Sequence, residues 1–214
     1  MVLMNKEIRN ACDGIDVHSY CLPIPVPFLN NRVGFLKRYR KFLDIFFPSV
    51  KVTMSEWCHM NGGRDAGMAS ALVAANTMFE DFTILGASSW QHWIAVSEVD
   101  YCDGLIYVNE DDKTFYTTKR LYVTGNFSKY IPLGAKRIAV SSDDDTLKTV
   151  AFADDEKTVI VVINDNKEEK TLENTFGKAV LTALTDKDND LTEKEIPENG
   201  AITIPPESVM TIVY

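Results

Sequence analysis

The sequence predicts a chain in two parts, an α/β segment followed by an all-β segment. Up to about residue 134, β-rich segments alternate with segments of helical periodicity, which is typical of parallel strands with helices outside them. From residue 136 onward, short β-rich segments recur between acidic or Gly/Asn turns, which is typical of an antiparallel β-sandwich. We therefore expect two domains, residues 1–135 and 136–214.

Periodicity and turn residues define the elements of the first part. The expected strands cover residues 14–18, 50–55 and 82–88, and the expected helices cover residues 32–47, 65–82 and 117–130. Pro23, Pro25 and Pro27 predict an extended loop after the first strand, because proline fixes φ and restrains the residue before it. Residues 103–108 look like one arm of a hairpin.

The second part contains seven expected strands. They cover residues 136–142, 148–153, 157–163, 168–173, 179–184, 201–204 and 208–214. The 214 residues carry a net charge of −9, of which −7 falls in residues 108–214, so a nucleic-acid partner is disfavoured. No apolar run reaches the roughly 18–20 residues of a membrane span, and the first ten residues contain no signal-peptide core.

We expect neither a metal nor a cofactor. The spacing of the four cysteines is not that of a disulfide scaffold, so free buried thiols are expected. A zinc site built from Cys21, Cys58, His59 and His92 is disfavoured, because no C-x-x-C pair would nucleate it. The acidic run at 186–190 imitates a calcium loop but lacks its glycine and final glutamate, which favours a solvated hairpin tip.

Three successive strand ends carry polar side chains beside aromatic ones. These ends are residues 18–20, residues 55–59 and residues 88–93. In parallel β/α folds, functional groups collect where the strands end, and a tryptophan beside a carboxylate suits a sugar ring. Taken singly, Glu56 could be a solvated loop residue, Trp90 and Trp93 core residues, and His18 a structural histidine. Their recurrence at three successive ends favours a carbohydrate site.

Several motifs resemble glycoside hydrolase family 30, whose members include glucosylceramidase, β-1,6-galactanases, β-1,6-glucanases and xylanases. The resemblance runs from about residue 14 to 214 and is carried by GIDVHSY, MSEWC, GASSWQHWIAVS, DYCDGLIYV, TFYTTKRLYVTGNFSKYIPLGAKRIAV and IPPESVMTI. It implies that the α/β part is a partial (β/α)8 TIM barrel, about strands 6–8, and that the rest is the family's β-sandwich side domain.

The family is retaining and uses two carboxylates, a nucleophile and a general acid/base. The resemblance gives Glu56, in the Ser55-Glu56 motif, the role of nucleophile. It gives Tyr20 a steadying role, with His18 in the same motif, and it places Trp90 in the sugar site. Gln91, Trp57 and Trp93 are further candidates for the wall of the site.

The acid/base of the family lies in an Asn-Glu pair at the end of strand four, and this sequence has no counterpart. Asn109-Glu110 follows strand eight instead. We therefore expect the chain to be part of a larger enzyme, inactive alone, whose partner is the missing N-terminal part of its own barrel. The resemblance makes a β-linked glycan or glycoside the substrate and an extracellular location the expectation. The alternative is a non-catalytic β-sandwich module that binds carbohydrate or has a structural role.

Overall fold

The computed structural model describes residues 4–20, 31–173, 177–196 and 201–214. The chain divides into two compact units. The first unit consists of Met1–Cys58 and Glu80–Trp93, and the second consists of His59–Phe79 and Ile94–Tyr214. The predicted loop with Pro23, Pro25 and Pro27 lies outside the described residues. Within the described residues, no helix combines the length and the apolar character needed to cross a membrane.

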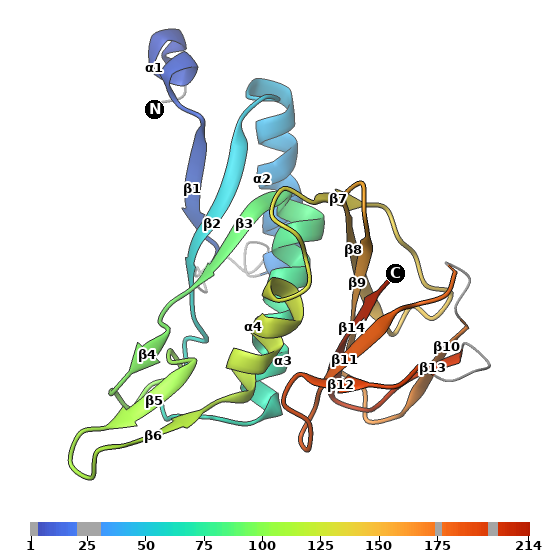
Figure 1. Cartoon of the computed structure of the whole chain (residues 1–214). Helices are drawn as coiled ribbons and strands as arrows, with labels where there is room; N and C mark the ends of the chain where they lie inside the picture. Colours follow the sequence, from blue (N-terminus) through green and yellow to red (C-terminus); the bar gives the residue numbers. More distant parts are fainter. Residues whose placement is uncertain (1–3, 21–30, 174–176, 197–200) are drawn as a thin grey trace. The chain divides into compact units, whose positions relative to one another are not determined.

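A three-stranded parallel sheet is the framework of the first unit. Strands β1 (Gly14–His18), β2 (Lys51–Trp57) and β3 (Ala87–His92) lie side by side in that order (Figure 1). The short helix α1 (Lys6–Ala11) precedes them. The parallel pairing confirms the predicted α/β class. Among the described strands β1 and β3 each have one neighbour, so the sheet has two open edges.

Helix α2 (Arg32–Phe46) packs the two side chains that it buries, Leu36 and Leu43, against the sheet. The Asn31 side chain caps the helix by accepting a hydrogen bond from the backbone N–H of Gly34 at 3.1 Å. The apolar spacing that predicted this helix places its buried side chains on one face. They form a cluster with buried residues of neighbouring segments: Leu36, Leu43, Phe47, Val52 and Leu85. Each such side chain contributes about 1.5–3 kcal/mol through burial.

The segment before β3 corrects the sequence prediction. We expected a strand over residues 82–88, but Asp81–Leu85 forms a π-helical turn, η3, directly after α3 (Met68–Glu80). Gly86 ends the turn in a left-handed conformation with φ of 72°. The aromatic and β-branched residues of this segment favour a strand locally, but Ile84 and Leu85 pack into the α2 cluster, and burial overrides propensity. Residues 88–92 therefore belong to the strand and not to a loop after it.

The second unit begins with helical and hairpin elements. Helix α4 (Lys119–Ser128) confirms the predicted helix over 117–130, and α3 confirms the one over 65–82. Strand β5 (Ile106–Asn109) pairs antiparallel with β6 (Thr114–Thr117), so the hairpin prediction is also confirmed. The two-residue strand β4 (Val96–Ser97) runs parallel to β5 and has no counterpart in the prediction.

Two antiparallel sheets form the sandwich. The larger has the order β12-β11-β14-β9-β8-β7, and the smaller pairs β10 with β13 (Figure 1). Their bounds are β7 (Lys136–Ile138), β8 (Lys148–Ala153), β9 (Thr158–Asn164), β10 (Lys170–Glu173), β11 (Leu181–Thr185), β12 (Thr192–Lys194), β13 (Ala201–Ile204) and β14 (Ser208–Val213). All seven predicted strands are present in this all-β part. The exposed strand β12 was not predicted, because it has no apolar pattern.

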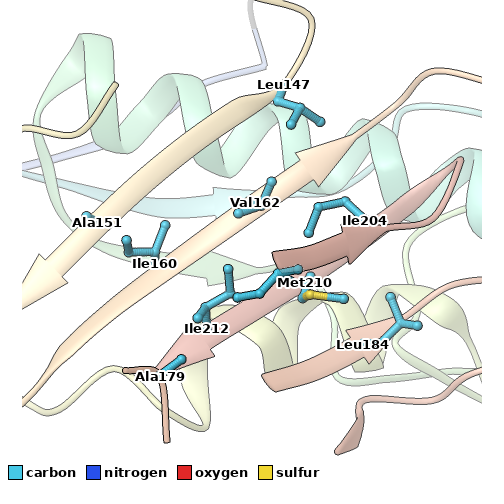
Figure 2. Close-up of a cluster of buried hydrophobic side chains, with 10 residues drawn as sticks. Leu147, Ala151, Ile160, Val162, Ala179, Leu184, Ile204, Met210 and Ile212 are labelled. Carbon is cyan, nitrogen blue, oxygen red and sulfur yellow. The ribbon is translucent and has the colours of Figure 1, made fainter. Parts of the chain in front are cut away.

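The core of the sandwich combines side chains from both sheets. Ile204 from β13 lies in one buried cluster with Val162 of β9 and Met210 of β14 (Figure 2). The alternate residues Val159 and Val213 point to the opposite face, where they join a cluster with Tyr130, which follows α4. The central strands are therefore buried on both faces, which explains their nearly continuous apolar sequences.

Candidate active site

Glu56 lies near the end of β2, beside two residues contributed by β1 and the segment after it. The hydroxyl of Tyr20 donates a hydrogen bond to Glu56 Oε1 at 3.0 Å, and His18 Nδ1 lies 3.6 Å from the same oxygen. A shift in the register of β1 against β2 places His18 opposite Glu56. The side chain of Glu56 is 29% exposed, so the carboxylate is held by neighbours and still reaches solvent.

Tyr20 is held in its protonated form. Burial raises the pKa of Tyr20 well above the ordinary value of 10.0, and its hydrogen bond to Glu56 raises it further. The hydroxyl also lies 3.9 Å from the sulfur of Cys58, which follows β2. Near neutral pH the phenol is therefore a fixed donor that orients one oxygen of Glu56.

Aromatic side chains of β2 and β3 pack together. The ring centroids of Trp57 and Trp90 lie 5.8 Å apart, and the centroid of His92 lies 6.0 Å from that of Trp90. Trp57 is only 5% exposed, so it supports the cluster from inside. Trp90 is half-buried and retains accessible surface. His92 was not among the predicted site residues, although its spacing from Trp90 places both on one face of a strand.

Gln91 and Trp93 lie at the surface of the first unit. Gln91 is exposed and, by strand alternation, faces away from Trp90. Trp93 follows β3 and is 49% exposed, and its backbone N–H donates to the carbonyl of Trp57 at 2.9 Å. The structure thus forms two groups, one of Glu56 with Tyr20 and His18, and one of Trp90 with Trp57 and His92.

The sequence prediction missed a buried carboxylate in the same unit. Asp81, the first residue of η3, accepts hydrogen bonds from Arg32, Ser19 and Trp90 at 2.7, 2.8 and 3.0 Å. Two of its partners lie far from it in sequence, Ser19 by 62 residues and Arg32 by 49, so no local pattern could have predicted the group. An acidic residue directly before an apolar segment was the only local signal.

The cysteines do not combine into a metal site among the residues that the structure describes. None of Cys12, Cys58 and Cys102 forms a disulfide; Cys58 and Cys102 are buried, as predicted, whereas Cys12 is exposed. Cys21, one residue of the disfavoured zinc set, lies outside the described residues. Across the described ranges, no group of three or more His, Cys, Asp or Glu side chains could hold a metal ion. Residues 186–191 connect β11 to β12, so the acidic run is the predicted hairpin tip.

Proteins of known sequence and structure are similar to the chain over most of its length. Lysosomal acid glucosylceramidase of Mus musculus is 28% identical over 193 residues, which are 80% of this chain and 34% of that protein. The structure of a conserved exported protein from Bacteroides fragilis matches with a TM-score of 0.78 and 24% identity, over 94% of this chain and 46% of the other. A family 30 endoxylanase from Clostridium papyrosolvens C71 matches with a TM-score of 0.73 and 18% identity, over 99% of this chain and 51% of the other.

The chain therefore spans about a third of the curated relative and about half of the two solved structures. Two family models also match it. Residues 15–107 match the model of O-glycosyl hydrolase family 30, and residues 134–212 match that of the glycosyl hydrolase family 30 beta sandwich domain. Since the two models describe one family and together account for most of the residues, the chain belongs to glycosyl hydrolase family 30.

Proposed function

We propose that the chain is the C-terminal portion of a retaining glycoside hydrolase that cleaves β-glycosidic bonds, with Glu56 as its nucleophile. The contact between the Tyr20 hydroxyl and Glu56 Oε1 carries this proposal. A nucleophilic carboxylate must be held in one orientation, and a phenol that donates a hydrogen bond at 3.0 Å provides this. Family membership supports a β-linked glycan or glycoside as the substrate.

In the proposed reaction, an oxygen of Glu56 attacks the anomeric carbon while the bond to the leaving oxygen breaks. Tyr20 and His18 both lie at Oε1, which leaves Oε2 as the oxygen better placed to attack. Trp90 supplies a ring face for the sugar, and its neighbour Trp57 supports that face from the interior. Trp93 is proposed as an outer wall residue, since it follows β3 and is 49% exposed. Gln91, on the opposite strand face from Trp90, is less well placed for this role.

The leaving oxygen needs a proton, and we propose that another part of the barrel supplies it. Asn109 and Glu110 belong to the β5–β6 hairpin, where the amide of Asn109 donates to Asp112, so this pair does not match the family's acid/base. Asp81 is buried and its two oxygens accept three hydrogen bonds, so it is not placed to give a proton to the leaving oxygen. Without a general acid, the chain alone should lose about 10²- to 10⁴-fold in rate from this step.

We propose the open edge of β1 as the place where the preceding barrel strand pairs. A barrel closes only when every strand has two neighbours, and the parallel sheet of this chain has two strands with one described neighbour each. The missing N-terminal part of the barrel is therefore the proposed partner. The domain boundary near residue 135 is also a proposal, and the family model of the sandwich, which begins at residue 134, supports it.

We further propose an extracellular location for the complete enzyme. The support is the fold shared with a protein from Bacteroides fragilis that is described as exported. Secretion of the complete protein into culture medium would test this, and its retention in the cytoplasm would contradict it.

Covalent labelling tests the role of Glu56. The chain would be treated with activated 2-deoxy-2-fluoro glycosides, alone and after the first five β/α units of a family 30 relative are supplied. We expect mass spectrometry to find the sugar on Glu56 only in the complemented barrel. Glu56→Gln should abolish labelling, whereas Glu98→Gln, at an exposed glutamate, should not.

Two results would contradict the proposal in different ways. A sugar attached to another residue would remove the nucleophile role from Glu56. Efficient hydrolysis by the isolated chain would show that the acid/base lies within these residues. Glycan binding retained by residues 136–214 alone would instead favour the non-catalytic sandwich module.

A further inference from the structure

Asp81 carries a charge in a place where burial makes a charge costly. Its side chain is 0% exposed, and burial raises its pKa, while Arg32, Ser19 and Trp90 act in the opposite direction. A carboxylate in such a place is retained only when its partners compensate for the lost hydration. The identity of those partners therefore indicates what the group does.

One partner neutralises the charge and the other two belong to the candidate site. Arg32, at the start of α2, donates to Oδ1 at 2.7 Å and also pairs with Glu80. Oδ2 accepts from the Ser19 hydroxyl at 2.8 Å and from the indole N–H of Trp90 at 3.0 Å. Arg32 neutralises the charge at Oδ1, and a buried carboxylate also needs donors for its second oxygen. Here both donors at Oδ2 come from segments of the candidate site.

The two bonds at Oδ2 join the ends of two strands. Ser19 directly precedes Tyr20, which orients Glu56, and Trp90 lies on β3 beside Trp57. The π-helical turn brings Asp81 to both, and such turns insert an extra residue into a helix, frequently at functional sites. Arg32 also donates to the Ser19 hydroxyl at 3.0 Å, which fixes the serine from a second direction.

We propose that Asp81 is a positioning residue that fixes Trp90 through its indole N–H and the Tyr20 segment through Ser19. This inference rests on the proposed function, because it makes Trp90 part of the sugar site. Since the N–H of Trp90 is donated to Asp81, the tryptophan presents its ring face to the sugar and does not hydrogen-bond a sugar hydroxyl. The subsite therefore selects for an apolar sugar face through stacking.

The indole N–H signals of the isolated chain test the anchor without any activity assay. The three tryptophans give three indole signals after ¹⁵N labelling, and Trp90→Phe assigns the relevant one. In Asp81→Asn we expect the Trp90 N–H to move upfield and to exchange with water about tenfold faster, as loss of a bond to a charged acceptor implies. Glu80→Gln is the matched control, because Glu80 also pairs with Arg32 and should leave the Trp90 signal in place.

The unsubstituted chain keeps the inference falsifiable if Asp81→Asn fails to fold. Its Trp90 N–H should exchange more slowly than that of Trp93, which is 49% exposed. Equal exchange of the two protons would overturn the anchor, and so would an unmoved Trp90 signal in folded Asp81→Asn.

Labelling in the complemented barrel separates this inference from the proposed function. We expect Asp81→Asn to slow the labelling of Glu56 about tenfold, with Glu80→Gln close to the unsubstituted chain. If the unsubstituted barrel is not labelled, the proposed function fails while the indole signals still decide on the anchor. If it is labelled and Asp81→Asn reacts equally fast, the positioning role is wrong.

Discussion

Two histidines illustrate how the surroundings of a residue decide its chemistry. His18 lies beside Glu56 with its side chain 53% exposed. His59 belongs to the second unit, where its Nδ1 lies 3.2 Å from the hydroxyl of Ser70. Burial and the nearby guanidinium of Arg120 lower the pKa of His59 below its ordinary 6.5. His59 therefore remains neutral in the folded chain at pH values where it is protonated in the unfolded chain.

The difference between the pKa of His59 in the folded chain and in the unfolded chain predicts a pH dependence of stability. Between the lowered pKa of His59 and 6.5 the unfolded chain binds more protons, so the free energy of unfolding falls as the pH falls through this window. His59→Gln removes this contribution. Urea unfolding from about pH 7.5 to about pH 5.5 should show a smaller loss of stability in His59→Gln than in the unsubstituted chain. Equal losses in the two chains would show that His59 does not contribute.

The π-helical turn η3 is the element that connects the fold to the candidate site. It places Asp81 inside the first unit, and it directs Ile84 and Leu85 into the cluster beneath α2. The chain can leave the turn and enter β3 only through Gly86, whose φ of 72° is unfavourable for any residue with a Cβ. One glycine therefore fixes the start of β3 and with it the position of Trp90.

Gly86→Ala tests the importance of this turn. A Cβ at this position would meet Arg40 at 3.7 Å, an ordinary contact, so the expected cost of about 1–2 kcal/mol comes from the backbone alone. Gly62→Ala is the control, because the φ of Gly62 is not positive and its Cβ would meet no atom within 4 Å. Denaturant unfolding measures both, and a Gly86→Ala variant as stable as the control would contradict the proposed strain.

At the scale of the whole molecule, the six-stranded sheet of the sandwich and the parallel sheet of the first unit differ in how well their strands are covered. The six-stranded sheet has β9 and β14 at its centre, with buried clusters on both faces. The parallel sheet has three strands, and its two outer strands each have one neighbour among the described residues. Backbone amides at an open edge are accessible to water and to other chains.

Hydrogen exchange should reveal this difference. In the isolated monomer we expect the amides of β1 and β3 to exchange faster than those of β9 and β14, because local opening costs less where fewer neighbours cover a strand. Strand β8 has a neighbour on each side in the sandwich, so its amides serve as the internal reference for a fully paired strand and should exchange as slowly as those of β9. Equal protection of both sheets would show that the open edges are not a weak point of the chain.

The sequence alone predicted the features that depend on local periodicity. The apolar spacing of 32–47 predicted α2, and short β-rich segments between acidic or Gly/Asn turns predicted the seven strands of the sandwich. The Ser55-Glu56 motif and its resemblance to family 30 directed attention to Glu56 and Tyr20, which the structure places in contact. The predictions of helices and strands succeeded because the residues that determine each element lie within a few positions of one another. The roles of Glu56 and Tyr20 stay proposals.

Only the tertiary structure decided the features that depend on distant residues. Residues 82–85 have the composition of a strand, yet packing against α2 holds them in a π-helical turn. The hydrogen bonds from Ser19, Arg32 and Trp90 to Asp81 bring separate segments of the chain together. Hydrophobic periodicity cannot predict these contacts, because it reports only on local structure. The sequence by itself determined the two-part fold and the Glu56 motif, because both depend on neighbouring residues. Only the folded chain decided the surroundings of Trp90, because the buried carboxylate of Asp81 is stabilised by groups that are close in space and not necessarily close in sequence.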